Sequence, residues 1–153
     1  MSPVSGPIAV YGASGYTGQL VARELQRRGL DHVLSGRNGA KLRALAERVG
    51  SDAPVHPAAA DDVPTLRRIL EDCAAVVNCA GPFTHIGEHV ARAAVESGTH
   101  YVDTTGEQPY MQRIFERLGP QAEHAEVAVV PAIGFDYLPG DLIAHLAARG
   151  AEP

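Results

Sequence analysis

Three glycines follow an apolar stretch near the start of the chain and are spaced three residues apart. Residues 8–11 read Ile-Ala-Val-Tyr, and Gly12, Gly15 and Gly18 come after them in a GxxGxxG pattern. Glycine lets a backbone turn sharply and approach a ligand closely, and the amides that open the next helix attract anions. The pattern therefore predicts a cradle for the pyrophosphate of a dinucleotide, although it departs from the GxGxxG fingerprint. The alternative is an ordinary strand-to-helix turn that is rich in glycine.

The end of the second predicted strand indicates which dinucleotide binds. In domains of this kind an Asp or Glu at that point binds the ribose 2′-hydroxyl of NAD, whereas an Arg suits the 2′-phosphate of NADP. No acid stands there in this sequence, and the turn offers Ser35, Arg37 and Asn38, with Lys41 one helical turn later. NADP is therefore favoured over NAD. The alternative is that Arg37 is a solvated surface charge without a ligand.

The composition is that of a compact protein without a polyanionic partner. The chain has 153 residues, of which 45% are hydrophobic, so it is long enough to bury a core as one domain. Its net charge of -5 and its scattered Lys and Arg argue against a nucleic-acid partner. The sequence contains no apolar run long enough to span a bilayer and no signal-like start, so we expect no membrane insertion and a cytoplasmic location.

Cysteine and histidine do not suggest a metal site. Cys73 and Cys79 fit neither a disulfide framework nor a metal pair, and Cys79 falls in a predicted strand, where a buried thiol acts as a small hydrophobe. We assign the seven histidines to no HExxH or paired-ligand pattern, so no metal is expected.

Strand and helix patterns alternate along the whole chain. The predicted strands are short, apolar and bounded by Gly, Pro or Asp, and they cover residues 7–11, 32–35, 54–58, 75–79, 100–103 and 127–131. The predicted helices cover residues 16–28, 39–49, 63–72, 86–97, 109–124 with a break at 119–120, and 141–149. This alternation predicts an α/β fold, a doubly wound parallel sheet of the Rossmann type with strand order 3-2-1-4-5-6. Ligands bind outside the carboxyl ends of such strands.

Two of the loops at that edge are richer than a connection requires. Residues 80–87 carry two glycines, a proline and an aromatic residue, which suggests a shaped wall beside the ribose and nicotinamide of the cofactor; the alternative is a plain tight turn. Residues 132–141 contain Asp136 and Tyr137, which either face a substrate or serve only to cap and pack. We expect Asp141 to cap the last helix, with Pro139 delaying its start.

Five strings together carry a resemblance to a known family. They are YGASGYTG, SGRN, NCAGPF, GTHYVDTTGE and AIGFDYLPGD, and they cover the chain from Ile8 to about Leu142. In this order they resemble the N-terminal half of the saccharopine dehydrogenase-like oxidoreductases, including the trans-acting enoyl reductase branch. The resemblance implies a Rossmann domain that binds NAD(P), with Gly12, Ser14, Gly15, Tyr16 and Thr17 at the pyrophosphate, Arg37 at the adenosine end, and Ala80, Gly81 and Pro82 beside the ribose and nicotinamide. The glycine pattern adds Gly18 to the predicted contacts, and the turn after the second strand adds Ser35 and Asn38.

The same resemblance implies that cofactor binding and substrate binding belong to different domains. Members of the family are usually longer and carry a second α+β domain for substrate binding and dimerisation. The 153 residues are therefore expected to form the dinucleotide-binding domain alone, which binds NADP(H) without turnover, while the catalytic residues and the small-molecule substrate stay unassigned. Self-association into a homo-oligomer stays open, because a domain without its partner half would expose an apolar patch.

Other classes are weighed against this hypothesis. A short-chain dehydrogenase needs a Tyr and a Lys four residues apart, and the only lysine, Lys41, does not follow any of the five tyrosines at that distance. The remaining alternatives are an NADP-sensing module that performs no chemistry, and a piece of a longer protein. Hydride transfer to or from a carbonyl, imine or activated alkene is the reaction expected of the complete enzyme.

Overall fold

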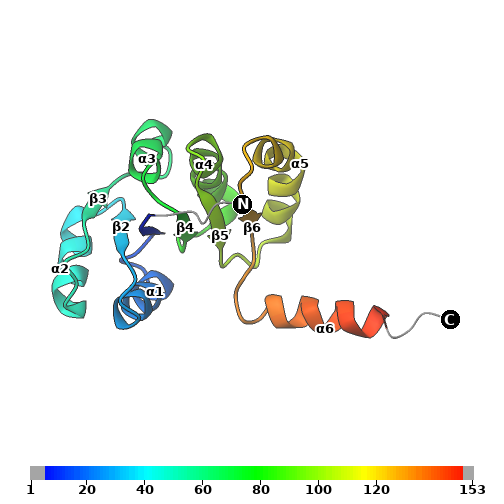
Figure 1. Cartoon of the computed structure of the whole chain (residues 1–153), viewed down its shortest axis with the longest axis horizontal. Helices are drawn as coiled ribbons and strands as arrows, with labels where there is room; N and C mark the ends of the chain where they lie inside the picture. Colours follow the sequence, from blue (N-terminus) through cyan, green and yellow to red (C-terminus); the bar gives the residue numbers. More distant parts are fainter. Residues whose placement is uncertain (1–5, 150–153) are drawn as a thin grey trace.

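The strands of the chain form one parallel sheet. The computed structural model describes residues 6–149, and Figure 1 shows its elements in order. The strands are β1 (Ile8–Tyr11), β2 (His32–Gly36), β3 (Val55–Pro57), β4 (Ala75–Asn78), β5 (His100–Asp103) and β6 (Val129–Val130). The helices are α1 (Tyr16–Arg27), α2 (Gly39–Val49), α3 (Val63–Leu70), α4 (Phe83–Glu96), α5 (Gln108–His124) and α6 (Leu138–Arg149). The order β3-β2-β1-β4-β5-β6 confirms the predicted doubly wound topology.

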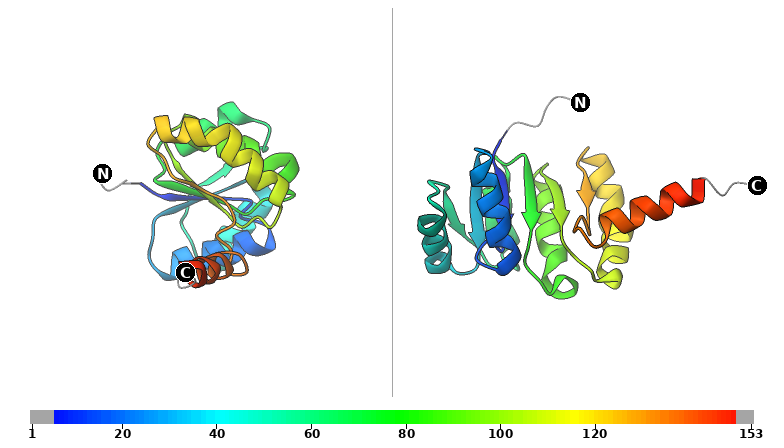
Figure 2. Two further views of the ribbon diagram at one scale, coloured as in Figure 1. Left: turned by 90° about the vertical axis from the view of Figure 1, so that its right-hand side faces the viewer. Right: turned by 90° about the horizontal axis from the view of Figure 1, so that it is seen from below.

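Helices cover the two faces of the sheet unequally. On one face, α1 and α2 pack against Val10 and Leu34. On the other, α3, α4 and α5 form a continuous layer over Ala9, Val76 and Tyr101, as Figure 1 shows. Neighbouring residues of β1 thus point into different cores, as expected for a strand buried on both sides. Helix α6 extends away from the sheet and has no residue buried against the described part of the chain (Figure 2).

The strand register brings four strand ends into one row. Tyr11 pairs with Ser35 on one side and with Asn78 on the other, and Asn78 pairs with Asp103. The loops that follow these residues therefore leave the sheet side by side at its carboxyl edge. This is the edge at which open α/β sheets bind their ligands.

One predicted helix break and two predicted helix starts are wrong, while the other helix limits agree to within two residues. Helix α5 continues through residues 119–120 because buried Ile114, Leu118 and Ala122 hold it on both sides of Pro120, although a proline removes one helical hydrogen bond. Helix α6 begins at Leu138 rather than at residue 141, since a proline is tolerated in a first turn; Asp141 lies inside that turn and is not the cap.

The other wrong start is that of α4, which lies at Phe83 instead of residue 86. The carboxylate of Glu107 accepts hydrogen bonds from the amides of Phe83 and Thr84, both at 2.8 Å, and from the Thr84 hydroxyl. A carboxylate from 24 residues further along thus satisfies the first amides of α4 and allows the helix to begin earlier.

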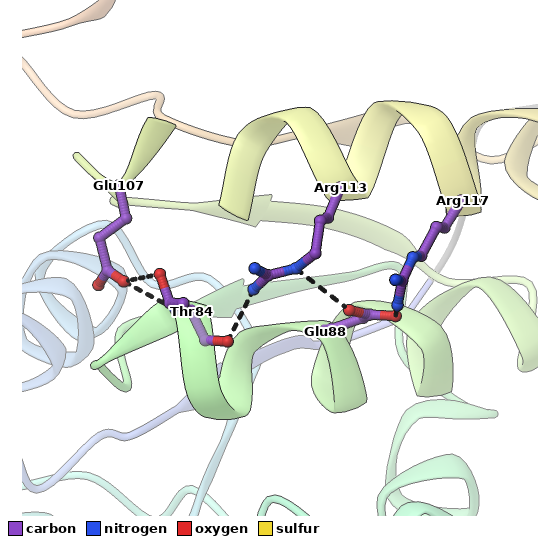
Figure 3. A network of polar contacts seen from close by, with 5 residues as sticks. All are labelled: Thr84, Glu88, Glu107, Arg113 and Arg117. Carbon is purple, nitrogen blue, oxygen red and sulfur yellow. Dashed lines mark hydrogen bonds and ion pairs between the residues drawn. The ribbon is translucent and has the colours of Figure 1, made fainter. Parts of the chain in front are cut away.

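A short polar network continues from this cap and joins α4 to α5, as Figure 3 shows. The Arg113 guanidinium donates to the Thr84 carbonyl oxygen at 2.7 Å and lies 3.7 Å from the Glu88 carboxylate. Arg117 lies 3.4 Å from the other oxygen of Glu88. The start of α4 is therefore held by charged and polar groups of the β5–α5 region.

Separately, no helix among residues 6–149 combines the length and the apolar character that a bilayer crossing requires.

The cap predicts a pH dependence of stability. Hydrogen bonds from Thr84, and then from the amides of Thr84 and Phe83, lower the pKa of the Glu107 carboxyl from its ordinary value. A carboxyl with a depressed pKa in the folded state stabilises the protein above its unfolded pKa of about 4.3, and this contribution is lost as the pH falls through the folded value. We expect Glu107→Gln to lower the free energy of unfolding by about 1 kcal/mol at pH 7, a typical cost of losing a cap. The difference from wild type should shrink as the pH falls below about 4.

Urea unfolding between pH 3 and pH 7 measures this difference. Glu47→Gln is the control, because Glu47 is exposed on α2 and its side chain makes no hydrogen bond within residues 6–149. A constant gap between Glu107→Gln and wild type at all pH values would contradict the assigned role of the ionised carboxylate.

Candidate functional site

Four segments of backbone converge at Gly12. This residue has a φ of 76°, and its amide donates to the Ser35 carbonyl oxygen at 2.9 Å. A Cβ placed on Gly12 would lie 2.8 Å from the amide nitrogen of Ala80, and one placed on Gly18 would overlap the Gly12 carbonyl oxygen. The end of β1, the first turn of α1, the end of β2 and the β4–α4 loop therefore touch here through backbone atoms.

The first turn of α1 is open to a ligand. Its N-cap is Gly15, and no side chain caps it in the described structure. The starts of α2, α3 and α4 are occupied by the side-chain oxygens of Asn38, Asp62 and Glu107 respectively. The first amides of a helix lack intrahelical partners and carry the positive end of its dipole, so an uncapped first turn is suited to an anion.

A neighbouring side chain that the sequence analysis missed supports the glycine loop. The Gln19 amide donates to the Ser14 carbonyl oxygen at 2.9 Å, and Arg48 donates to the Gln19 side-chain oxygen at 2.8 Å. Helix α2 thus holds the loop through Gln19. No pattern in the sequence signals this role for a glutamine on α1.

A cleft of about 700 Å³ lies along the carboxyl edge in front of this turn. Seven of the predicted contact residues line it, namely Gly12, Ser14, Gly15, Arg37, Ala80, Gly81 and Pro82. The structure therefore brings the glycine loop, the end of β2 and the β4–α4 loop to one opening. The peptide bond between Gly81 and Pro82 is cis.

The other predicted contact residues do not line the cleft. Tyr16 and Thr17 belong to the first turn of α1, and Tyr16 is 83% exposed. Gly18 is buried against the glycine loop. The Ser35 hydroxyl is buried and donates to the His56 carbonyl oxygen at 2.8 Å, while Asn38 caps α2. Cofactor contact stays a prediction for all twelve residues, the seven that line the cleft and these five.

Several side chains in the cleft were not among the predicted contacts. Asp61 follows β3, and His85, Ile86 and His89 belong to α4. His85 and His89 are four residues apart and so lie on one helix face, a spacing that the sequence analysis passed over. Apart from His89, these side chains could have been predicted at the cleft from the sequence, because residues 59–62 and 80–87 directly follow predicted strands. Among residues 6–149, no group of three metal-ligating side chains gathers.

Two weakly acidic groups in the cleft remain protonated near neutral pH. Burial, and then the charge of Asp61, raises the pKa of Tyr11 to about 12, with Arg37 acting in the opposite direction. The Tyr11 hydroxyl donates to the Ala58 carbonyl oxygen at 3.2 Å. Burial, and then the charge of Asp103, raises the pKa of Cys79 to about 12. Neither group is therefore activated as a base or a nucleophile.

The residues present fit an NADP molecule at two points. Arg37 is exposed at the mouth of the cleft, and its guanidinium makes no ion pair or hydrogen bond with any residue from 6 to 149. No acid stands at the end of β2, where one would repel a 2′-phosphate. The glycine loop fits the other point, because the absence of a side chain on Gly15 leaves the first turn of α1 accessible.

The segment after β6 is folded against the β5–α5 loop. The Tyr137 hydroxyl donates to the Gly106 carbonyl oxygen at 3.0 Å, which supports the packing alternative for this side chain. Asp136 is exposed, and neither residue lines the cleft.

Comparison with known proteins agrees with this arrangement. A "lipid droplet localized protein" of Caenorhabditis elegans is 36% identical over 146 residues, covering 88% of the chain and 34% of the relative. The trans-acting enoyl reductase of Mycobacterium ulcerans is 33% identical over 151 residues, covering 95% of the chain and 36% of the relative. The chain thus spans about a third of the length of these relatives. Saccharopine dehydrogenase (L-Glu forming) from Saccharomyces cerevisiae shares the fold, with a TM-score of 0.72 at 24% identity over 86% of the chain and 28% of that structure.

The relatives overturn one expectation. The prediction of a cytoplasmic location is wrong, because the Caenorhabditis elegans relative is named for lipid droplets and an Arabidopsis thaliana relative is named a probable mitochondrial saccharopine dehydrogenase-like oxidoreductase. The Arabidopsis protein is 33% identical over 161 residues, covering 93% of the chain and 36% of the relative. Location varies among proteins that share this domain, so the domain sequence does not determine it.

The family assignment follows from the extent of the match. The sequence profile of the saccharopine dehydrogenase NADP binding domain matches residues 8–130, from the first residue of β1 to the last residue of β6. This range contains the glycine loop, Arg37 and the β4–α4 loop. The chain therefore belongs to the saccharopine dehydrogenase NADP-binding domain family, and its cofactor is NADP.

Proposed function

We propose that the chain holds NADP(H) across the carboxyl ends of its strands for an oxidoreductase reaction. The observation that carries this proposal is the uncapped first turn of α1, which opens into a cleft of about 700 Å³. The amides around Gly15 would bind the pyrophosphate, Arg37 would bind the 2′-phosphate, and residues 80–82 would lie beside the nicotinamide riboside. This direction along the sheet follows the general rule for doubly wound nucleotide-binding folds.

The chain contributes binding and orientation rather than a complete active site. The bound cofactor supplies hydride chemistry, directed at a carbonyl, imine or enoyl group. The names of the relatives, oxidoreductases and a trans-acting enoyl reductase, support this class of reaction. Tyr11 and Cys79 are protonated and poorly acidic, so neither supports proton transfer in the cleft. This chain matches about a third of the length of these relatives, and we assign the substrate-binding groups to the remaining two thirds.

The cofactor proposal predicts a selective effect at Arg37. Arg37→Ala should weaken NADPH binding by roughly ten- to a hundredfold, because a charge-assisted contact with a phosphate is worth on the order of 1.5–3 kcal/mol. NADH lacks the 2′-phosphate, so its affinity should hardly change. Calorimetric titration with both nucleotides measures this difference.

Lys41→Ala is the matched control for charge. Lys41 is an exposed cation one turn after Arg37 but does not line the cleft, so its loss should change both affinities by less than about threefold if only long-range screened charge is involved. Equal losses for NADPH and NADH in Arg37→Ala would contradict the assignment of Arg37 to the 2′-phosphate.

The pyrophosphate site is tested at Gly15. A Cβ on this residue would lie 3.2 Å from the Gly12 carbonyl oxygen, a close contact that needs a small local shift, and a larger side chain should project into the anion site. We expect Gly15→Val to abolish binding of both NADPH and NADH while the far-UV circular dichroism spectrum is retained. Gly140→Val serves as the control, because Gly140 lies in α6 with nothing within 4 Å of an added Cβ. NADPH binding to Gly15→Val at wild-type affinity would place the cofactor elsewhere.

A further inference from the structure

The wall of the cleft between β4 and α4 has no side chain that can hold it in place. It consists of Gly81 and Pro82, and neither side chain can form a hydrogen bond. Both residues are exposed. The Pro82 carbonyl oxygen accepts from the amides of His85 and Ile86, both at 3.2 Å, which joins the wall to the first turn of α4. The position of the wall therefore depends on what holds Ala80 on one side and the start of α4, at Phe83, on the other.

The inner end of the wall is held by a chain of buried polar side chains. The Asn78 carboxamide oxygen accepts from the Ala80 amide at 3.0 Å, and its nitrogen donates to the Tyr101 hydroxyl at 3.0 Å. The Tyr101 hydroxyl donates to the Asp103 carboxylate at 2.8 Å. Asn78, Tyr101 and Asp103 are completely buried. Because the single proton of the Tyr101 hydroxyl is given to Asp103, the hydroxyl of Tyr110, 2.8 Å away, must donate to Tyr101.

The outer end of the wall leads to the same carboxylate. Glu107 accepts from the Phe83 amide at 2.8 Å, and the Glu107 amide donates to the Thr105 hydroxyl at 3.0 Å. The Thr105 amide in turn donates to Asp103 at 3.0 Å. The inner arm runs from Ala80 to Asp103, and the outer arm runs from Phe83 to Asp103. Together with residues 81–82, the two arms close a ring of hydrogen bonds.

Asp103 also fixes the segment that leads away from the sheet. The oxygen that accepts from the β5–α5 loop accepts from the Ala132 amide as well, at 2.9 Å, and the Asp103 carbonyl oxygen accepts from the Ile133 amide at 2.9 Å. Ala132 has a φ of 61°, which is unusual for a residue with a side chain. The hydrogen bond from its amide to the Asp103 carboxylate fixes the chain at this point. The buried Asp103 carboxylate thus holds the β5–α5 loop and the segment after β6 directly, and it reaches the β4–α4 loop through Tyr101 and Asn78.

We propose that this ring positions residues 81–82 for the nicotinamide half of the cofactor, with Tyr101 on the inner arm and Glu107 on the outer arm as positioning residues. The inference rests on the proposed placement of the nicotinamide riboside beside residues 80–82. None of the ring's side chains lines the cleft, so they act on the cofactor only through the wall. Their removal should therefore affect the nicotinamide half of the molecule and spare the adenosine half.

Two ligands separate these halves. NADPH is one, and 2′-phospho-ADP, which keeps the adenosine, the 2′-phosphate and the pyrophosphate but lacks the nicotinamide riboside, is the other. Tyr101→Phe removes one hydroxyl group and keeps the aromatic side chain. We expect it to weaken NADPH binding by about five- to tenfold, the effect of losing one well-placed hydrogen bond, and to leave 2′-phospho-ADP within about twofold of wild type. The fluorescence anisotropy of bound NADPH, which reports the mobility of the nicotinamide, should fall.

Glu107→Gln tests the outer arm at a position that is partly exposed, so it serves even if Tyr101→Phe does not fold. It should produce the same selective loss for NADPH. Thr99→Val is the matched control, because the Thr99 hydroxyl is fully buried at the amino end of β5 and donates to the Leu70 carbonyl oxygen at 2.7 Å, away from the wall. This variant should lower stability without changing the ratio of the two affinities.

The outcomes distinguish the two proposals. A selective loss of NADPH affinity in Tyr101→Phe or Glu107→Gln, absent in Thr99→Val, supports the positioning role. Equal losses of affinity for NADPH and 2′-phospho-ADP, or an unchanged ratio of these two affinities in every variant that folds, would overturn the positioning role. The proposed cofactor site would still stand. If the wild-type chain binds neither ligand, the proposed cofactor site fails, and the positioning role fails with it.

Discussion

Close backbone contact at Gly12 is the constraint on which the site depends. The glycine loop can open toward a ligand only if β1 ends where α1 begins, and α1 can begin there only because Gly18 lies against the Gly12 carbonyl group. A side chain at either position would separate the helix from the strand. The same contact reaches Ala80, so the pyrophosphate cradle and the wall beside β4 are held in one arrangement. This explains why three glycines occur within seven residues of an otherwise ordinary strand-helix unit.

The helix N-termini near the cleft show how the anion site is made selective. Asn38, Asp62 and Glu107 each supply an oxygen to the first amides of a helix, and only α1 among the first four helices lacks such a cap in the described structure. Of these four helix starts, an anion that approaches the edge finds only the first turn of α1 uncapped. Glu107 has a further effect, because its carboxylate neutralises the start of α4 beside the wall. In the proposed arrangement, this neutralisation favours the pyrophosphate at α1 over α4.

The sequence predicted the sheet well because its strands are short apolar segments separated by helices, and the right-handed crossover of parallel units leaves few possible strand orders. The glycine loop and Arg37 were predicted because glycine spacing and a missing acid are local patterns. The start of α4 was not, since its cap comes from Glu107, 24 residues later. The continuity of α5 through Pro120 depends on packing by Ile114 and Leu118, which no local pattern shows.

The buried inner arm of the ring, formed by Asn78, Tyr101 and Asp103, occupies the better covered face of the sheet. Along β4 and β5 the side chains alternate, so that Asn78 and Tyr101 face the layer of α3, α4 and α5, whereas Val77 and Val102 face the other side and are only partly buried. Val77, Val102 and Val130 pair in register on that less covered side, where α6 extends away from the sheet (Figure 2).

Polar groups removed from water are costly unless each finds a partner, and every buried side-chain nitrogen and oxygen in the described residues has one. Such a network is rigid only where water cannot compete for its hydrogen bonds. The placement of Asn78, Tyr101 and Asp103 under the helices is therefore what allows side chains outside the cleft to fix its wall.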